Sequence, residues 1–431
     1  MTVPPEEHGA GADRLPAVAG ALREAAARYG TPVYVTDDTV LAAAVDELRA
    51  AFPDPWIRQY SVKANDVPAV VARIAGPGRD LGANVVSRGE WRVATAAGVP
   101  NERITLEGIG KTEADLAAAV RAAATGRPLL WTALESPEEA EALAARAARA
   151  GLGRGRLPSL DVLLRLNPDV NPETQAELAV GVGGSKFGMT ETELSASVER
   201  LAGTTAIRPR GVHLHVGSQL GAVDAWRDAV RRGLALVGLL RGGLPSVDTL
   251  DVGGGFAVVD PDDAAPRPAR FARELPALLE AIPADRRPIR FAIEPGRFVV
   301  ARAGWLVARV LHVRDRGGRQ VVLDAGMTEL IRPALYGADH AIVALTGSGL
   351  AVEASPMIPG QAAAVHGPIC ESTDALGTHD LPTLRRGDLV AIRDAGAYAA
   401  SQSSTYNGRP RPAQVILESD GRLALGRPRG R

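Results

Sequence analysis

The stretch Tyr60-Ser61-Val62-Lys63-Ala64-Asn65 places a lysine at the end of an apolar run, directly before a small residue and a turn former. A lysine in that position points from the end of a strand into a cleft, where burial can lower the pKa of its amine and make it a nucleophile. Most charged residues that cap a strand are instead solvated and inert. The meaning of Lys63 therefore depends on the segments that follow it.

Four later segments repeat this placement, because each is a short strand-like run that ends in residues suited to a phosphorylated cofactor. They are residues 163–168, 211–219, 250–256 and 291–297. In the third, Gly253, Gly254 and Gly255 would let backbone N–H groups approach a phosphate without interference from Cβ atoms. Each feature alone has an ordinary explanation: a glycine triplet is usually a flexible turn, His215 a core residue and Glu294 a surface carboxylate. Their recurrence at strand ends favours one shared site.

The pattern up to residue 295 alternates short apolar runs with longer amphipathic stretches, which is typical of parallel strands joined by helices. Eight strands are predicted to begin near Ile57, Asn84, Ile104, Leu129, Asp161, Gly211, Thr249 and Arg290. Eight strand-helix units over about 240 residues predict a (β/α)8 TIM-type barrel, in which chemistry gathers at the carboxyl ends of the strands. After Arg297 the runs are strand-like without long helices, so a second, mostly antiparallel β domain is expected.

Composition limits the possible partners and compartments. The chain has 431 residues, of which 46% are hydrophobic and 23% charged, which is ordinary for a globular enzyme. Its formal net charge of -1 gives no electrostatic reason to expect nucleic acid or an anionic membrane as a partner. No apolar stretch is long enough to span a bilayer, and the single cysteine, Cys370, excludes an intrachain disulfide. A cytoplasmic location is expected.

Together with Lys63, the four segments resemble the fold-type III pyridoxal-phosphate decarboxylases, which include the diaminopimelate, ornithine and arginine decarboxylases. The resemblance runs from about Gly30 to about Leu417 and is closest to the diaminopimelate branch. It implies that residues 38–295 form the cofactor-binding barrel. Residues 14–37 and 296–420 would form the β domain, with residues 1–13 as a mobile tail and 421–431 as a C-terminal tail.

The resemblance also implies roles for residues around pyridoxal 5'-phosphate. Lys63 would bind the cofactor covalently, His215 would stack on the pyridine ring, and Glu294 would keep the pyridine nitrogen protonated so that the ring accepts electrons. The remaining cofactor contacts implied are Arg165, Ser218, Gly253, Gly254, Gly255, Gly296, Arg297 and Tyr398. No metal is expected.

Two segments of the β domain, residues 367–372 and 394–398, resemble segments that reach into the barrel of a partner subunit. Within them, Cys370 matches the proton donor that ends the reaction, and Tyr398 matches a residue that contacts phosphate and substrate. A composite site of this kind implies a homodimer with shared active sites. Lys63, His215, Glu294 and Cys370 are therefore the catalytic residues expected from the resemblance.

The substrate is expected to be meso-diaminopimelate, converted to L-lysine and carbon dioxide in lysine biosynthesis. Two guanidinium groups and a phenol suit a distal carboxylate, and a carboxylate suits the distal ammonium. The residues that match substrate-binding positions of the diaminopimelate branch are Arg297, Arg332, Tyr336, Glu371 and Tyr398.

Departures from that branch keep two alternatives open. Asn84 stands where the family usually has an aspartate, Thr373 replaces a glycine, and residues 107–111 and 175–181 lack side chains that the family normally carries there. The first alternative is a paralogue that decarboxylates another amino acid or a carrier-linked aminoacyl group in a specialised pathway. The second is a non-catalytic protein that binds pyridoxal phosphate, against which the long β domain argues.

Overall fold

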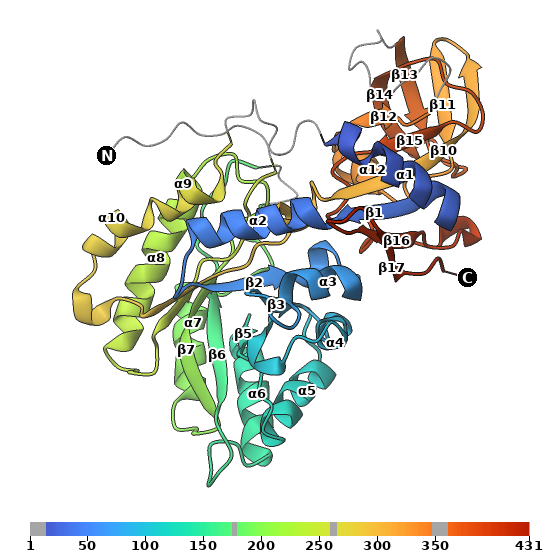
Figure 1. The fold of residues 1–431 in the computed structure, drawn as a ribbon. Coiled ribbons are helices and arrows are strands. Elements are labelled where there is room, and N and C mark those ends of the chain that lie inside the picture. The colour runs from blue at the N-terminus through green and yellow to red at the C-terminus, as the bar shows by residue number, and fades with distance from the viewer. Residues whose placement is uncertain (1–13, 175–178, 259–264, 347–360, 431) are drawn as a thin grey trace.

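A computed structural model describes residues 14–174, 179–258, 265–346 and 361–430 of the chain (Figure 1). The barrel occupies the lower left of the view, and the β domain lies at its upper right. The predicted N-terminal tail, residues 1–13, falls outside the described residues. Among the described residues, no helix is both long and apolar enough to cross a membrane.

The barrel is closed, and every neighbouring pair of its eight strands is parallel. The strands are β2 (Ile57–Ser61), β3 (Gly82–Val85), β4 (Ile104–Leu106), β5 (Trp131–Leu134), β6 (Leu160–Leu166), β7 (Ile207–Leu214), β8 (Thr249–Asp251) and β9 (Arg290–Ile293). Their side chains are mostly buried because helices cover the outside of the sheet. The predicted (β/α)8 barrel is therefore confirmed, with strand starts shifted by a few residues.

Helices follow the barrel strands along the chain. They are α2 (Asp38–Ala51), α3 (Pro68–Ala75), α4 (Arg88–Ala96), α5 (Glu113–Ala124), α6 (Pro137–Arg149), α7 (Glu191–Leu201), α8 (Asp224–Arg241), α9 (Pro268–Ala272), α10 (Leu275–Glu280) and α11 (Arg297–Val300). Helices α4 to α7 begin after Ser87, Thr112, Ser136 and Thr190, whose hydroxyls accept a backbone N–H from the first turn. Short 3-10 turns lie at η1 (Val62–Ala64), η2 (Asn101–Arg103), η4 (Ala284–Arg286) and η5 (Tyr406–Gly408).

The β domain is a nine-stranded mixed sheet with the main order β14-β13-β11-β10-β1-β16-β17, and β15 pairs with both β10 and β12. Its strands are β1 (Val33–Asp37), β10 (Gly304–Asp315), β11 (Arg319–Leu323), β12 (Ile342–Ala344), β13 (Gln361–His366), β14 (Ala375–Leu381), β15 (Leu389–Ile392), β16 (Ala413–Leu417) and β17 (Leu423–Arg427). Among the strands that the structure describes in this domain, only the pairs β1–β16 and β11–β13 are parallel. The predicted β domain is thus mostly antiparallel, as expected. Helix α1 (Leu15–Tyr29) packs Val18 and Leu22 against it, and α12 (Arg332–Tyr336) follows β11.

Two strands of this sheet were not predicted. Strand β17 lies within residues 421–431, which were expected to be a tail, and it pairs antiparallel with β16. Its short, arginine- and glycine-containing sequence carries little strand pattern, so its structure depends on the neighbouring strand and on burial of Leu423. Strand β14 also carries little strand pattern because its sequence contains several polar residues. It pairs antiparallel with β13.

The β domain touches the barrel beside the strand end that carries Lys63. The backbone N–H of Tyr398 donates to the carbonyl of Ala64 at 2.7 Å, and the Asn65 side-chain amide donates to the carbonyl of Gly396 at 3.0 Å. A Cβ atom at Gly396 would lie 1.7 Å from the carbonyl oxygen of Val300, so only glycine allows this approach. The contact brings Tyr398 to the mouth of the barrel.

Candidate active site

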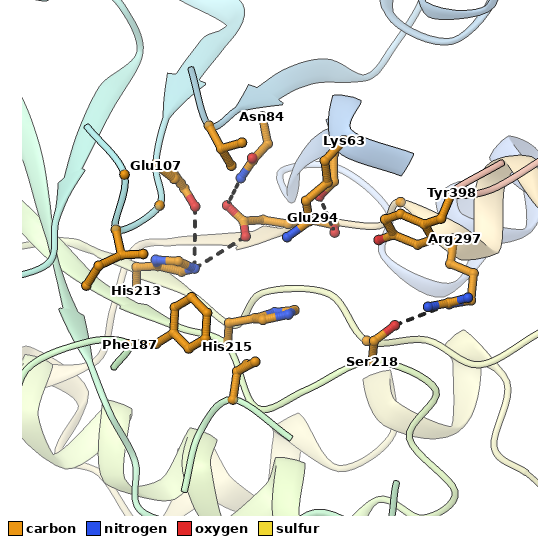
Figure 2. Close-up of a pocket in the computed structure, with 18 of the residues that line it drawn as sticks. Lys63, Asn84, Glu107, Phe187, His213, His215, Ser218, Glu294, Arg297 and Tyr398 are labelled. Carbon is orange, nitrogen blue, oxygen red and sulfur yellow. Dashed lines mark hydrogen bonds and ion pairs between the residues drawn. The ribbon is translucent and has the colours of Figure 1, made fainter. Parts of the chain in front are cut away.

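A cavity of about 420 Å³ opens at the carboxyl ends of the barrel strands. Figure 2 shows that Ser218, Arg297 and Tyr398 lie on one side of it and Asn84, Glu107 and His213 on the other. The residues predicted from sequence that line it are Lys63, Arg165, His215, Ser218, Gly255, Glu294, Gly296, Arg297, Arg332, Tyr336 and Tyr398. Gly253, Gly254, Cys370 and Glu371 are not among the lining residues.

Lys63 sits in the 3-10 turn η1, which begins where β2 ends. Its neighbours Val62 and Ala64 are buried and fix the turn, while the lysine side chain is exposed along the cavity wall. The expected burial of its amine is therefore not seen in the single chain, because the cavity is open at this point. In the structure, Lys63 lies at a strand end and faces a cleft, which is the position predicted for it.

Glu294 directly follows β9 and is buried. The side-chain amide of Asn84, on β3, donates to its Oε1 atom, and the hydroxyl of Ser61 donates to its backbone carbonyl at 3.0 Å. An amide donor stabilises a carboxylate, whereas an aspartate at position 84 would place a second carboxyl group there. The Asn84 amide therefore holds the Glu294 carboxylate in place, with the carboxylate as the hydrogen-bond acceptor.

His215 follows β7 with its ring against the glycine turn after β8. The backbone N–H of Gly254 donates to its Nδ1 atom at 3.4 Å. Burial, with the positive charges of Lys63 and Arg165, holds the pKa of His215 well below its usual value. The ring is therefore a neutral, flat group, which suits stacking on an aromatic cofactor.

A cradle for a phosphate lies at the end of the cavity formed by Ser218, Gly255, Gly296 and Arg297. Arg297 donates from Nε to the Ser218 hydroxyl at 3.2 Å. Gly255 has a φ of +101°, and a Cβ atom there would lie 2.6 Å from the carbonyl oxygen of Gly217, so a side chain would close the cradle. These donors and this space fit the phosphate group of pyridoxal phosphate.

Gly253 and Gly254 were expected to donate to the phosphate, and this expectation is corrected. The Gly253 N–H donates to Asp251 Oδ1 at 2.9 Å, and the Gly254 N–H faces His215. Of the three glycines, Gly255 is the one that lines the cavity.

Two arginines gather near the mouth of the cavity. Burial and the nearby charge of Arg297 lower the pKa of Arg332 to about 10, and burial lowers the pKa of Arg297 as well. Arg332 contacts Nε2 of His340 at 2.9 Å, and the Arg297 guanidinium lies 4.7 Å from the centre of the Tyr398 ring. Two cations held together in this way favour an anionic group between them.

Cys370 and Glu371 lie on the exposed surface of the β domain instead. Asn407 donates to Cys370 Sγ at 3.4 Å, and the Tyr406 hydroxyl donates to Glu371. Tyr398, by contrast, lines the cavity of its own chain. The expectation that residues 394–398 serve the partner's barrel is therefore wrong for Tyr398, because this segment is fixed to its own barrel by Gly396 and Ala64.

Three buried ionisable residues in or next to the cavity wall were not predicted from the sequence. These are Glu107 after β4, His213 in β7 and Asp251 in β8. One carboxylate oxygen from each of Glu107 and Glu294 and one ring nitrogen of His213 all lie within 4.8 Å of one another. Two signals could have revealed them: Glu107 and Asp251 end apolar runs as Lys63 does, and His213 is two residues before His215, on the same face of one strand.

A lysine at a strand end, a buried carboxylate, a neutral stacking histidine and a phosphate cradle define a (β/α)8-barrel enzyme built to hold pyridoxal phosphate. Residues 40–301 match the model of the pyridoxal-dependent decarboxylase family, pyridoxal binding domain. This chain belongs to the pyridoxal-dependent decarboxylases.

Individual relatives agree in length as well as in sequence. The diaminopimelate decarboxylase of Aquifex aeolicus is 35% identical over 92% of this chain and 89% of its own length. That of Deinococcus radiodurans is 36% identical over 92% of both chains. The crystal structure of the Helicobacter pylori diaminopimelate decarboxylase complexed with L-lysine has a TM-score of 0.83 at 28% identity, covering 95% of this chain and 96% of that one.

Proposed function

We propose that this protein is a pyridoxal-phosphate-dependent decarboxylase that converts meso-diaminopimelate to L-lysine and carbon dioxide. The observation that carries the proposal is the arrangement of one cavity, which has Lys63 and Glu294 in its wall and the cations Arg297 and Arg332 near its mouth. The names of the matched relatives, and the L-lysine bound to one of them, support the same substrate and product.

Each of the lining residues then has a chemical role. Bound pyridoxal phosphate supplies an electron-poor ring that accepts the negative charge left at Cα when carbon dioxide departs. Lys63 offers the amine that holds the cofactor, and Glu294 provides the negative charge beside its ring nitrogen. His215 would fix the tilt of the ring, and Ser218 and Arg297, which are hydrogen-bonded to each other, would hold the phosphate.

The mouth of the cavity would select the substrate. A distal carboxylate placed between Arg332 and Arg297 gains charge-assisted hydrogen bonds and relieves the repulsion between the two guanidinium groups. The Tyr336 phenol lines the same part of the cavity. Substrates of the ornithine type lack a distal carboxylate and would leave this cationic pair unsatisfied.

The proposal includes a homodimer with shared sites. Cys370 and Glu371 are exposed in the single chain and do not line its cavity, so a second copy is the natural place for their chemistry. Cys370 would deliver the final proton in the partner's barrel, and Glu371 would face the distal ammonium there. Residues 38–295 would act as the cofactor domain, with residues 14–37 and 296–420 as the domain that completes the neighbouring site.

Assay of carbon dioxide release tests the proposal. Purified protein loaded with pyridoxal phosphate is supplied separately with meso-diaminopimelate, L-ornithine, L-arginine and L-lysine, and the products are identified by chromatography. The proposal is supported if lysine forms from meso-diaminopimelate and none of the other three amino acids releases carbon dioxide. Release of carbon dioxide from another of these amino acids but not from meso-diaminopimelate would favour the paralogue, and cofactor binding without any release would favour a binding protein.

Replacing Arg332 by glutamine is expected to raise KM for meso-diaminopimelate by about 10- to 100-fold with a smaller change in kcat. The reason is that the lost contacts are charge-assisted hydrogen bonds to a group far from the reacting carbon. Steady-state kinetics measure both constants. Arg316→Gln, at an exposed arginine of the β10–β11 turn, is the matched control and should leave KM unchanged. Equal KM values for the wild type, Arg332→Gln and Arg316→Gln would show that Arg332 does not belong to the substrate site.

A further inference from the structure

Four barrel strands bring buried ionisable side chains together at one part of the cavity: Glu107, His213 and Glu294, which line it, and Asp251 (Figure 2 labels all but Asp251). His213 Nε2 lies 3.3 Å from Glu294 Oε2 and 3.5 Å from Glu107 Oε2. Only Glu294 has the role of holding the cofactor's ring nitrogen. The other three residues have no part in the proposed function as described so far.

Three carboxyl groups this close cannot all be ionised without water. Burial and the negative charge of Glu294 raise the pKa of Glu107 to about 8, and the same two causes raise the pKa of Asp251 well above its usual value. Burial lowers the pKa of His213 to about 4. At neutral pH, Glu107 therefore keeps its proton, and the His213 imidazole is neutral.

The hydrogen-bond geometry around Glu294 is that of a carboxylate enclosed by donors. The Asn84 amide donates to Oε1, and His213 Nε2 faces Oε2. An oxygen of Glu107 lies within 4.8 Å of an oxygen of Glu294, and both carboxyl groups face His213 Nε2. Trp131 donates from Nε1 to Glu107 Oε1 at 3.1 Å, so the other oxygen of Glu107 is the one that carries the hydrogen.

We propose that Glu107 is a positioning residue, a neutral carboxylic acid that donates a hydrogen bond to Glu294 and so keeps Glu294 as the ionised carboxylate of this group. Donors around a carboxylate lower its proton affinity. With Glu107 in place, a proton shared between Glu294 and a ring nitrogen stays on the nitrogen. The presence of that ring rests on the proposed function, whereas the protonation of Glu107 is independent of it.

The other charges that face this group are accounted for by their own partners or lie on the cofactor side. Arg165, on β6, forms a buried ion pair with Glu135 after β5. Lys63 lies on the cavity side of the group, where the cofactor would bind it. A rise in pH through about 8 is therefore expected to remove the proton from Glu107.

Infrared spectroscopy of the cofactor-loaded protein tests this directly. With ¹³C-labelled glutamate, a carboxylic acid C=O band that shifts with the label should be present at pH 7, absent in Glu107→Gln, and lost in the wild type as pH rises through about 8. The control Glu102→Gln, at an exposed acid, should keep the band. ¹⁵N NMR of histidine-labelled protein should show His213 neutral with its hydrogen on Nε2. Absence of the band, or a doubly protonated His213, would overturn the proposal.

Kinetics of two variants separate a neutral donor from an anion. Glu107→Leu, which removes the donor, is expected to lower kcat about 10- to 100-fold, and Glu107→Gln, whose amide still donates, should restore it to within about threefold of wild type. If Glu107→Gln is as slow as Glu107→Leu, a neutral donor is not what the site needs and the proposal fails. An infrared band present in a protein that releases no carbon dioxide from meso-diaminopimelate would support Glu107 as the acid and contradict only the proposed function.

Discussion

Replacing Lys63 by alanine is expected to lower kcat for carbon dioxide release by at least about 10³-fold, because no other group supplies the amine that holds the cofactor. The long-wavelength absorbance of lysine-bound pyridoxal phosphate should disappear from the purified variant as well. Steady-state kinetics and an absorbance spectrum measure the two effects. The cavity residues around Lys63 are unchanged in this variant, so cofactor held only by its phosphate contacts would be weakly bound and lost on dialysis.

The composition of the chain makes the control unusually clear. The sequence contains three lysines, Lys63, Lys111 and Lys186. The Lys111 side chain is fully buried and pairs with Glu139 at 3.1 Å, whereas Lys186 is exposed beside Phe187 near the cavity. Lys186→Ala should keep the absorbance and most of the activity. Borohydride reduction followed by peptide mass spectrometry should label Lys63 alone, and a label on Lys186 would contradict the assignment.

The barrel and the centre of its site were predictable because their signals are local. Each parallel strand is a short apolar run, and residues at its carboxyl end must face the same rim as those of its neighbours. Lys63, His215 and Glu294 therefore converge although they are far apart in the sequence, and the cavity in the structure has all three in its wall.

What the sequence did not reveal depends on contacts between distant segments. Glu107 and Asp251 each end an apolar run, but no local signal shows that their pKa values are raised, because this shift arises from burial together beside Glu294. Strand β17 forms because β16 offers it a partner edge. The resemblance implied the same role for the two β-domain segments, yet Tyr398 lines its own barrel while Cys370 remains outside it.

The second large effect is expected at Cys370. Cys370→Ala should lower kcat by about 10²- to 10⁴-fold, which is the usual cost of losing a positioned general acid. The thiol lies on the surface of the single chain with Asn407 as its hydrogen-bond donor, so this substitution should leave the fold and the cofactor absorbance intact. Steady-state kinetics and the absorbance spectrum check both statements. Unchanged kcat would remove Cys370 from the reaction.

Heterodimers made from Lys63→Ala and Cys370→Ala subunits decide whose barrel the thiol serves. If Cys370 acts in the partner's barrel, one site of the heterodimer has both groups and the other has neither, so about half of the wild-type activity should return. If it acts in its own barrel, each site lacks one group and activity stays at the level of the parents. Two affinity tags isolate the mixed species. The pair Lys63→Ala with Glu294→Ala is the matched control: both residues line one barrel, so no intact site can form and no activity should return.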